Sequence, residues 1–208
     1  MLISHKHKFI FIHIYKTAGT SITHALIPFS SSKLKYNLHR VLRKVRIDTF
    51  NPFPFPKHIS AERLSQNIGI ETFSNYFTFS FVRNPWDWQV SLYNFMLSHP
   101  EHPQHQLIKN LGSFDSYIQW RKKKGMRSQK RQLSDSSGKI MVDFIGRYES
   151  LNDDFNTICK KIGASTSLPH IHNGMGMPYQ HYYTKETKEI VSELCREDIE
   201  FFDYSFDD

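Results

Sequence analysis

The stretch from Ile10 to Ile22, IFIHIYKTAGTSI, decides the fold. Its apolar run predicts a strand buried on both faces, and a helical pattern begins at Thr20 and Ser21. Between them lies a short turn of small residues, where N–H groups at the start of the helix can surround a phosphate. The stretch therefore predicts a strand, a phosphate-binding loop and a helix.

Two more apolar runs predict strands of the same kind. The three predicted strands cover residues 8–14, 76–82 (YFTFSFV) and 140–145 (IMVDFI). Helical spacing follows at 20–27, 86–98, 113–123, 150–162 and 184–201, with Ser113, Ser150 and Thr184 placed as N-caps. Strands that alternate with helices predict an α/β fold, a three-layer, mostly parallel sheet flanked by helices.

Composition indicates one domain and an anionic partner. The chain has 208 residues, of which 39% are hydrophobic, enough for one core, so we expect a single domain over residues 1–208. A net charge of +7 favours nucleotide, polysaccharide, membrane or nucleic acid as partner. Cys159 and Cys195 have no metal-binding spacing, and the N-terminus resembles neither a signal peptide nor a membrane span. We therefore expect a cytoplasmic protein.

Two segments have weaker patterns. The segment 30–73 includes FNPFPFPKHIS, whose three prolines exclude a helix or a central strand, and we expect it to run over the sheet edge with two helical turns at 61–67. The basic, serine-rich segment 121–139 predicts a mobile solvated loop, and the alternative is a contact with an acidic substrate.

The loop departs from the phosphate loop of ATPases. In GxxxxGK(S/T) the lysine follows the second glycine and a strand-end acid helps to hold magnesium, whereas here Lys16 precedes Gly19. Backbone N–H groups of residues 17–21, with Thr17 and Ala18 at the start, can still ring a phosphate. Lys16 would then approach it from the strand side.

The second strand ends in an arginine rather than a carboxylate. Arg83 follows YFTFSFV, and Ser91 lies eight residues later on a helix opened by Pro85 and Trp86. A guanidinium and a hydroxyl placed beyond the strand ends can converge on a second phosphate. Two phosphate sites without a metal site describe a doubly phosphorylated nucleotide used without a catalytic cation.

Three ordered motifs carry a family resemblance. KTAGTS, FVRNPWDWQVSLY and FIGRYESL each follow a predicted strand, and the similarity extends through YYTKET to DIEFFDYSF. The chain resembles carbohydrate sulfotransferases of the heparan and chondroitin O-sulfotransferase type, especially their short bacterial members. That family uses 3′-phosphoadenosine 5′-phosphosulfate (PAPS) and has a P-loop-like fold. Tyr15 stands where the family often has proline, which could loosen the loop.

The resemblance implies a role for each motif. Lys16, Thr17, Gly19, Thr20 and Ser21, together with the backbone of Ala18, would hold the 5′-phosphosulfate of PAPS. Arg83 and Ser91 would hold its 3′-phosphate. The acceptor would be a hydroxyl of a carbohydrate or glycoconjugate, and no metal, nucleic acid or membrane span is expected.

Sulfuryl transfer needs a base and a cation. Lys16 is placed to stabilise the charge that grows on the leaving phosphate oxygen. We select His58 in PKHISAERL as the base, because a neutral imidazole accepts a proton near pH 7 and because the family has a histidine in a similar segment. His13, inside the first strand, is interpreted as a satisfied core histidine.

Other residues keep two interpretations. Trp86 and Trp88 fit the core better than stacking on a ligand, and the asparagine and proline of RNPW would shape a turn. Arg147 and Glu149 form either an ion pair or a substrate contact. Asn173 and Tyr183 are weak candidates for ligand contacts, in a region whose histidines, His170, His172 and His181, do not have zinc spacing.

Two rival functions remain open on the sequence. A phosphotransferase of the kinase type would need magnesium and a strand-end carboxylate, for which Asp143 is the candidate. A non-enzymatic module that binds polyanions would instead use the basic run at 121–131.

Overall fold

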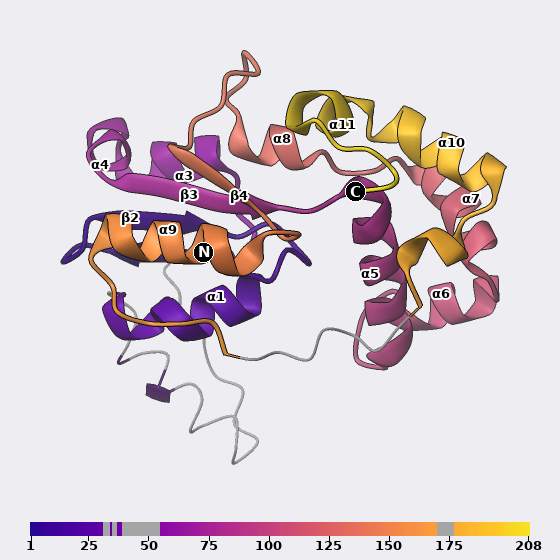
Figure 1. The fold of residues 1–208 in the computed structure, drawn as a ribbon, viewed down its shortest axis with the longest axis horizontal. Coiled ribbons are helices and arrows are strands. Elements are labelled where there is room, and N and C mark those ends of the chain that lie inside the picture. The colour runs from indigo at the N-terminus through magenta and orange to yellow at the C-terminus, as the bar shows by residue number, and fades with distance from the viewer. Residues whose placement is uncertain (31–33, 35–36, 39–54, 170–176) are drawn as a thin grey trace. The chain divides into compact units, whose positions relative to one another are not determined.

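The computed structural model describes residues 1–30, 34, 37–38, 55–169 and 177–208. The chain divides into two compact units, each of which is described by itself. The first unit is Met1–Val82 with Arg131–Ile171, and the second is Arg83–Lys130 with His172–Asp208 (Figure 1). Whether residues 1–208 act as one domain stays a prediction.

The first unit is built on a four-stranded sheet with strand order β1-β2-β3-β4. Strands β2, β3 and β4 are parallel to one another, and β1 pairs antiparallel with β2. Their bounds are Leu2–Ser4 for β1, Phe9–Ile12 for β2, Phe77–Val82 for β3 and Phe144–Arg147 for β4. The predicted α/β fold with a mostly parallel sheet is confirmed, whereas β1 was not predicted.

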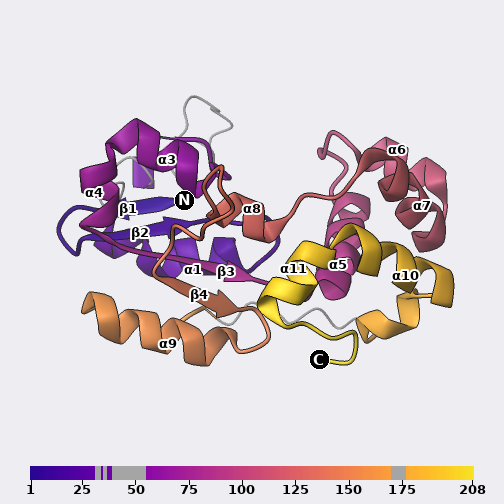
Figure 2. The ribbon, with the colours of Figure 1, turned by 90° about the horizontal axis from the view of Figure 1, so that it is seen from above.

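Helices cover both faces of this sheet. Helices α1 (Gly19–Leu26) and α9 (Leu151–Ile162) lie on one face, and α3 (Ala61–Ile68) and α4 (Ile70–Ser74) lie on the other (Figure 2). Alternation along β2 and β3 turns four phenylalanines toward α1 and α9, because successive side chains of a strand point to opposite faces. These four are Phe9, Phe11, Phe79 and Phe81, all fully buried.

The second unit is helical. It contains α5 (Pro85–Ser98), α6 (His105–Leu111), α7 (Phe114–Lys124), η2 (Tyr179–Tyr182), α10 (Lys185–Leu194) and α11 (Arg196–Phe202). Helix α10 packs against α7 and α5 (Figure 1). Trp86 and Trp88 of α5 are buried, so their predicted place in the core is confirmed. The short helix α8 (Gln129–Leu133) begins in this unit and ends in the first.

Two of the three predicted N-caps make the expected bond. Ser113 accepts from the N–H of Ser116, and Thr184 forms a reciprocal capping box with Thr187. Ser150 occupies the N-cap position of α9, but its hydroxyl donates to the carboxylate of Asp154 at 2.7 Å instead.

Three predicted elements need correction. The helix expected at 184–201 is two helices, α10 and α11, separated at Cys195. The strand expected at 140–145 begins only at Phe144, since Ile140 forms an isolated bridge with Ser134. The segment 121–139 is not a continuous solvated loop, because it ends α7 and forms α8, in which Gln129 and Leu133 are buried.

The remaining expectations concern cysteines, termini and the proline-rich segment. Cys159 and Cys195 are both free and buried. None of the helices in the described ranges has the length and apolar character that a bilayer crossing requires. Two helical turns were expected at 61–67, and α3 confirms them. Much of the segment 30–73 lies outside the described residues.

Candidate functional site

The loop between β2 and α1 has an unusual backbone. Lys16 has φ 64° and Ala18 has φ 60°, both in the left-handed region, whereas Thr17 between them does not have a positive φ. Alternating signs of φ direct successive N–H groups toward one point, which is the concave main-chain arrangement that binds anions. Ala18 is also the N-cap of α1 and supplies no side-chain bond to the first turn of that helix. The alternating φ signs therefore support the predicted phosphate-binding loop.

The side chains of the loop divide into structural and outward-facing groups. Thr17 is fully buried, and its hydroxyl donates to the carbonyl of Ile14 at 3.0 Å, so its side chain braces the loop. Ser21 is also buried, whereas Thr20 is exposed and Lys16 is half-buried. The buried Thr17 side chain thus leaves only its main chain to face a ligand, a distinction that the motif alone does not make.

Gly19 is required for close packing against His13. A Cβ built at Gly19 would lie 1.8 Å from Nε2 of His13 and 1.9 Å from Cδ2, far inside contact distance. The φ of Gly19 is not positive, so the glycine is needed because of the imidazole beneath it and not because of backbone conformation. The first turn of α1 therefore rests directly on the ring of His13.

His13 is buried as predicted, with 3% of its surface exposed, but it is not satisfied. Within the described residues, its Nδ1 has no hydrogen-bond partner. Burial lowers the pKa of His13 well below 6.5, and the Met1 amino group, His58 and Lys57 add to this effect. His13 is consequently a neutral ring, and its interpretation as a satisfied core histidine is wrong.

His58 lies directly beside the loop. It belongs to a turn in which the N–H of Ile59 donates to the carbonyl of Pro56, just before the Ser60 N-cap of α3. Nδ1 of His58 lies 3.0 Å from the carbonyl oxygen of His13. A carbonyl can only accept, so Nδ1 carries the proton and Nε2 carries the lone pair of the neutral ring. In this tautomer Nε2 is the nitrogen that can accept a proton, as a general base must.

Aromatic rings hold the plane of His58. The ring of His13 lies 4.6 Å from it, and the ring of Tyr15 meets it edge to face at 5.0 Å. Tyr15, the departure from the family pattern, therefore packs against the candidate base. Burial also raises the pKa of the Tyr15 hydroxyl.

A further side chain reaches the same place. Nε2 of Gln132, from α8, donates to the carbonyl of His13 at 3.2 Å and to that of His58 at 3.4 Å. Sequence reasoning did not find Gln132, because neither spacing nor a motif links position 132 to positions 13 and 58.

The second predicted phosphate site lies in the other unit. Nε of Arg83 forms an ion pair with Asp87 at 2.6 Å, and its side chain is 12% exposed. Gln129 accepts from the Arg83 N–H at 3.0 Å and donates to the Arg83 carbonyl at 2.8 Å. Ser91 is half-buried and lies one helical turn after Asp87 on α5. The i, i+4 spacing of Arg83 and Asp87 was the signal that could have revealed this pairing.

The turn that follows Arg83 has the predicted structure. Asn84 is the N-cap of α5 and accepts from the N–H of Trp86 at 3.0 Å, with Pro85 at the first helical position. The hydroxyl of Tyr183 donates to the carbonyl of Trp86 at 2.8 Å. Asn173, the other weak candidate, lies outside the described residues, as do His170 and His172.

Asp143 lies at the wrong end of its strand for metal binding near the loop. Its Oδ2 accepts from the N–H of Thr78 at 2.7 Å and from the Thr78 hydroxyl at 2.9 Å. Thr78 is near the amino end of β3, and Asp143 directly precedes β4. The phosphate loop follows the carboxyl end of the parallel β2. The carboxylate that a kinase mechanism needed is therefore not Asp143.

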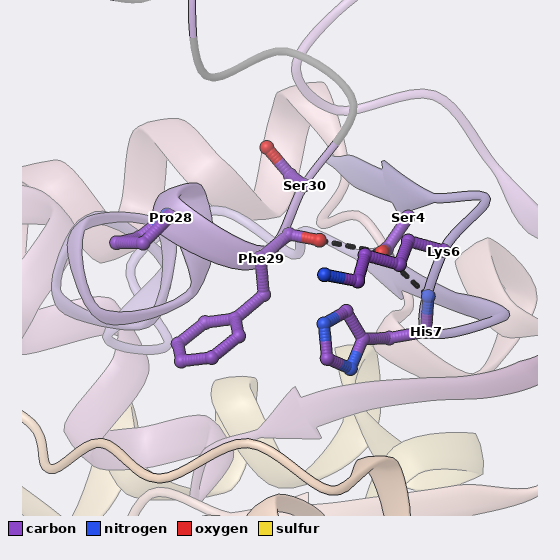
Figure 3. A pocket seen from close by; sticks show the side chains of 6 residues that line it. All are labelled: Ser4, Lys6, His7, Pro28, Phe29 and Ser30. Atoms are coloured by element: carbon purple, nitrogen blue, oxygen red, sulfur yellow. Dashed lines mark hydrogen bonds between the residues drawn. The ribbon is translucent and has the colours of Figure 1, made fainter.

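A cavity in the described residues lies away from these sites. A cavity of about 390 Å³ adjoins the turn between β1 and β2, at the opposite end of β2 from the loop (Figure 3). Its lining is Ser4, Lys6, His7, Pro28, Phe29 and Ser30, none of which was a predicted site residue. Among the residues with described positions, no three His, Cys, Asp or Glu side chains gather closely enough to hold a metal ion.

A mostly parallel sheet with a loop of this backbone conformation after its first parallel strand is typical of α/β proteins that bind phosphorylated ligands. The profile of the sulfotransferase family matches residues 1–205, and the chain belongs to that family. The chain is also 32% identical over 113 residues to an uncharacterized protein of Archaeoglobus fulgidus, covering 50% of this chain and 82% of that protein. Sulfotransferases move a sulfuryl group, and the family generally takes it from PAPS. The resemblance to a sulfotransferase family is thus confirmed.

Proposed function

We propose that this sulfotransferase moves the sulfuryl group of PAPS to a hydroxyl of a carbohydrate or glycoconjugate, with His58 as base. The observation that carries the proposal is the bond from His58 Nδ1 to the carbonyl of His13, the residue that leads into the phosphate loop. This bond supports His58 as a base of defined tautomer, in the same compact unit as the proposed anion site. A reaction that needs both groups is proton removal coupled to displacement at a phosphosulfate.

The donor would be held at two points. The main chain of residues 17–21 and the ammonium of Lys16 would take the 5′-phosphosulfate, and Arg83 with Ser91 would take the 3′-phosphate. Arg83 follows Val82, the last residue of β3, and β3 is the parallel neighbour of β2. Ligands of open parallel sheets bind beyond the carboxyl ends of neighbouring strands, which supports Arg83 as a donor-binding residue.

The chemistry is an in-line displacement at sulfur. Nε2 of His58 removes the proton of the acceptor hydroxyl while its oxygen forms a bond to sulfur. The bond between sulfur and the phosphate oxygen breaks, and the electron pair stays on adenosine 3′,5′-bisphosphate. The Lys16 ammonium and the loop N–H groups stabilise this charge, a kind of contribution whose loss commonly costs on the order of 10²-fold in rate. The proton remains on His58 until the product leaves.

The test is transfer from PAPS to a panel of glycans, with His58→Ala and Lys16→Ala as variants. We expect His58→Ala to lower kcat by about 10²-fold or more and to leave the calorimetric affinity for adenosine 3′,5′-bisphosphate nearly unchanged. Lys16→Ala should lower kcat by a similar factor. His5→Ala, at the exposed turn between β1 and β2, is the matched control and should keep full activity.

Three outcomes would count against the proposal. They are absence of transfer to every glycan together with absence of bisphosphate binding, unchanged turnover of His58→Ala, and nucleotide binding that prefers ATP and requires Mg²⁺. The last result would favour phosphoryl transfer. If the protein were instead a polyanion-binding module, the Lys16→Ala variant would bind the polymer as well as the wild type does, and the affinity of both would fall steeply with salt concentration. The two free thiols support a reducing compartment such as the cytoplasm as the working location.

A further inference from the structure

The amide of Gln132 ties two main-chain carbonyls together. Its Nε2 donates to the oxygen of His13 at 3.2 Å and to the oxygen of His58 at 3.4 Å. Both partners are acceptors only, so the amide must present its NH₂ group to them, one hydrogen for each. Three segments distant in sequence, the end of β2, the turn at 56–59 and helix α8, therefore meet at one side chain.

The carbonyl oxygen of His13 is shared by two donors. It accepts from Nδ1 of His58 at 3.0 Å and from Nε2 of Gln132 at 3.2 Å, which uses both of its lone pairs. The bond to His58 selects the tautomer of that ring. Gln132 holds the same oxygen from a second direction and also holds the peptide of His58 itself.

The packing around His58 does not select the tautomer. The rings of His13 and Tyr15 meet it at 61° and 84°, which fixes the plane of the imidazole. A ring flipped by 180° would keep those contacts but would place carbon against the carbonyl in place of Nδ1. The hydrogen bond to the carbonyl decides between the two orientations, so whatever fixes that carbonyl fixes the reactive nitrogen.

We propose that Gln132 is a positioning residue for the base. By fixing the carbonyl of His13 and the backbone of His58, it keeps the proton on Nδ1 and directs the lone pair of Nε2 to the acceptor hydroxyl. The inference rests on the proposed role of His58 in sulfuryl transfer. Gln132 itself is assigned no contact with PAPS or with the acceptor hydroxyl.

The experiment compares Gln132→Met, which keeps the length of the side chain without a donor, with Gln132→Glu, which replaces the donors by acceptors. We expect kcat to fall about tenfold in both, because a misplaced base loses reactive orientation, while KM for PAPS and the Kd of adenosine 3′,5′-bisphosphate stay within about twofold. Gln66→Met, on the exposed side of α3, is the control and should keep wild-type kcat.

A second measurement reports the tautomer directly. ¹⁵N NMR of the histidine rings, with the His58 signals identified by their loss in His58→Ala, should show proton on Nδ1 in the wild type and a mixture of both tautomers in the Gln132 variants. A merely structural role for Gln132 would lower stability to urea without changing these signals.

The outcomes separate this inference from the proposed function. Wild-type kcat and an unchanged tautomer in the Gln132 variants, beside an inactive His58→Ala, would overturn the role of Gln132 alone. An active His58→Ala would overturn the base itself. Should neither Gln132 variant fold, the wild-type spectrum still decides, because a proton on Nε2 of His58 would contradict the inference.

Discussion

Replacing Gly19 by alanine tests whether the phosphate loop rests on His13. The new Cβ would lie 1.8 Å from Nε2 of His13, about 1.6 Å short of ordinary contact at 3.4 Å. The ring cannot easily retreat, because it is 3% exposed and packs against the rings of Phe11, at 5.7 Å, and His58, at 4.6 Å. Overpacking of this kind costs about 1–3 kcal/mol.

The displaced atoms include the N–H groups that the phosphate would use. We therefore expect Gly19→Ala to lower the free energy of unfolding in urea by about 1–3 kcal/mol, and to weaken calorimetric binding of adenosine 3′,5′-bisphosphate by at least about tenfold. The loss of affinity should exceed what the loss of stability explains, since the folded loop itself is distorted.

A double-mutant cycle supplies the control. His13→Ala removes the ring, so Gly19→Ala added to it should be neutral, or stabilising by up to about 1 kcal/mol because alanine is the better helix former. The cost of Gly19→Ala should thus disappear in the His13→Ala background. If Gly19→Ala alone matches the wild type in stability and in nucleotide affinity, the close packing of α1 on His13 is refuted.

Three more predictions concern single side chains. Arg83→Ala should weaken binding of adenosine 3′,5′-bisphosphate by about 2 kcal/mol in calorimetry; unchanged affinity would mean that Arg83 serves only its ion pair with Asp87. The pKa of His13 is lowered by burial, so below about pH 6.5 the unfolded chain takes up a proton that the folded chain does not, and stability falls as the pH falls. His13→Asn should therefore lessen the loss of unfolding free energy between pH 6.5 and 5.5 by up to about 1.0 kcal/mol, measured in urea, whereas an identical pH dependence would show that His13 takes up its proton equally in the folded and unfolded chain. Asp143→Ala should lower stability by about 1–3 kcal/mol through the lost bonds to Thr78 and leave sulfuryl transfer intact, and a large loss of kcat would contradict its structural role.

The fold was predictable where burial dominates the sequence pattern. The run that became β2 is continuous and apolar, and the run that became β3 alternates phenylalanine with the buried Thr78 and Ser80, because both faces of this part of the sheet are covered. Strand β1 has only three residues and no periodicity, and it pairs with β2 through a turn in which Lys8 has φ 47°. No local sequence signal therefore predicted it. The break at Cys195 was missed because the apolar spacing continues from α10 into α11.

The parts of the candidate site that could be predicted are those formed by residues close together in the sequence. The turn between the first predicted strand and its helix, and the turn at Asn84, are local structures, and both occur where the sequence predicts them. The contact of His58 with the loop and the bonds of Gln132 depend on long-range packing, which no spacing encodes. His13 illustrates the difference, since burial could be predicted from the strand but the lack of a partner for Nδ1 could not.

The small strand β1 has a consequence for solubility. It occupies one side of β2, whose sequence FIFI contains no charge, proline or glycine. With β1 removed, the main-chain N–H and C=O groups of that segment would form an open edge that invites pairing with other molecules, a recognised route to aggregation. Three residues thus cover one hydrogen-bonding edge of an uncharged, apolar strand, and their deletion should increase aggregation of the protein.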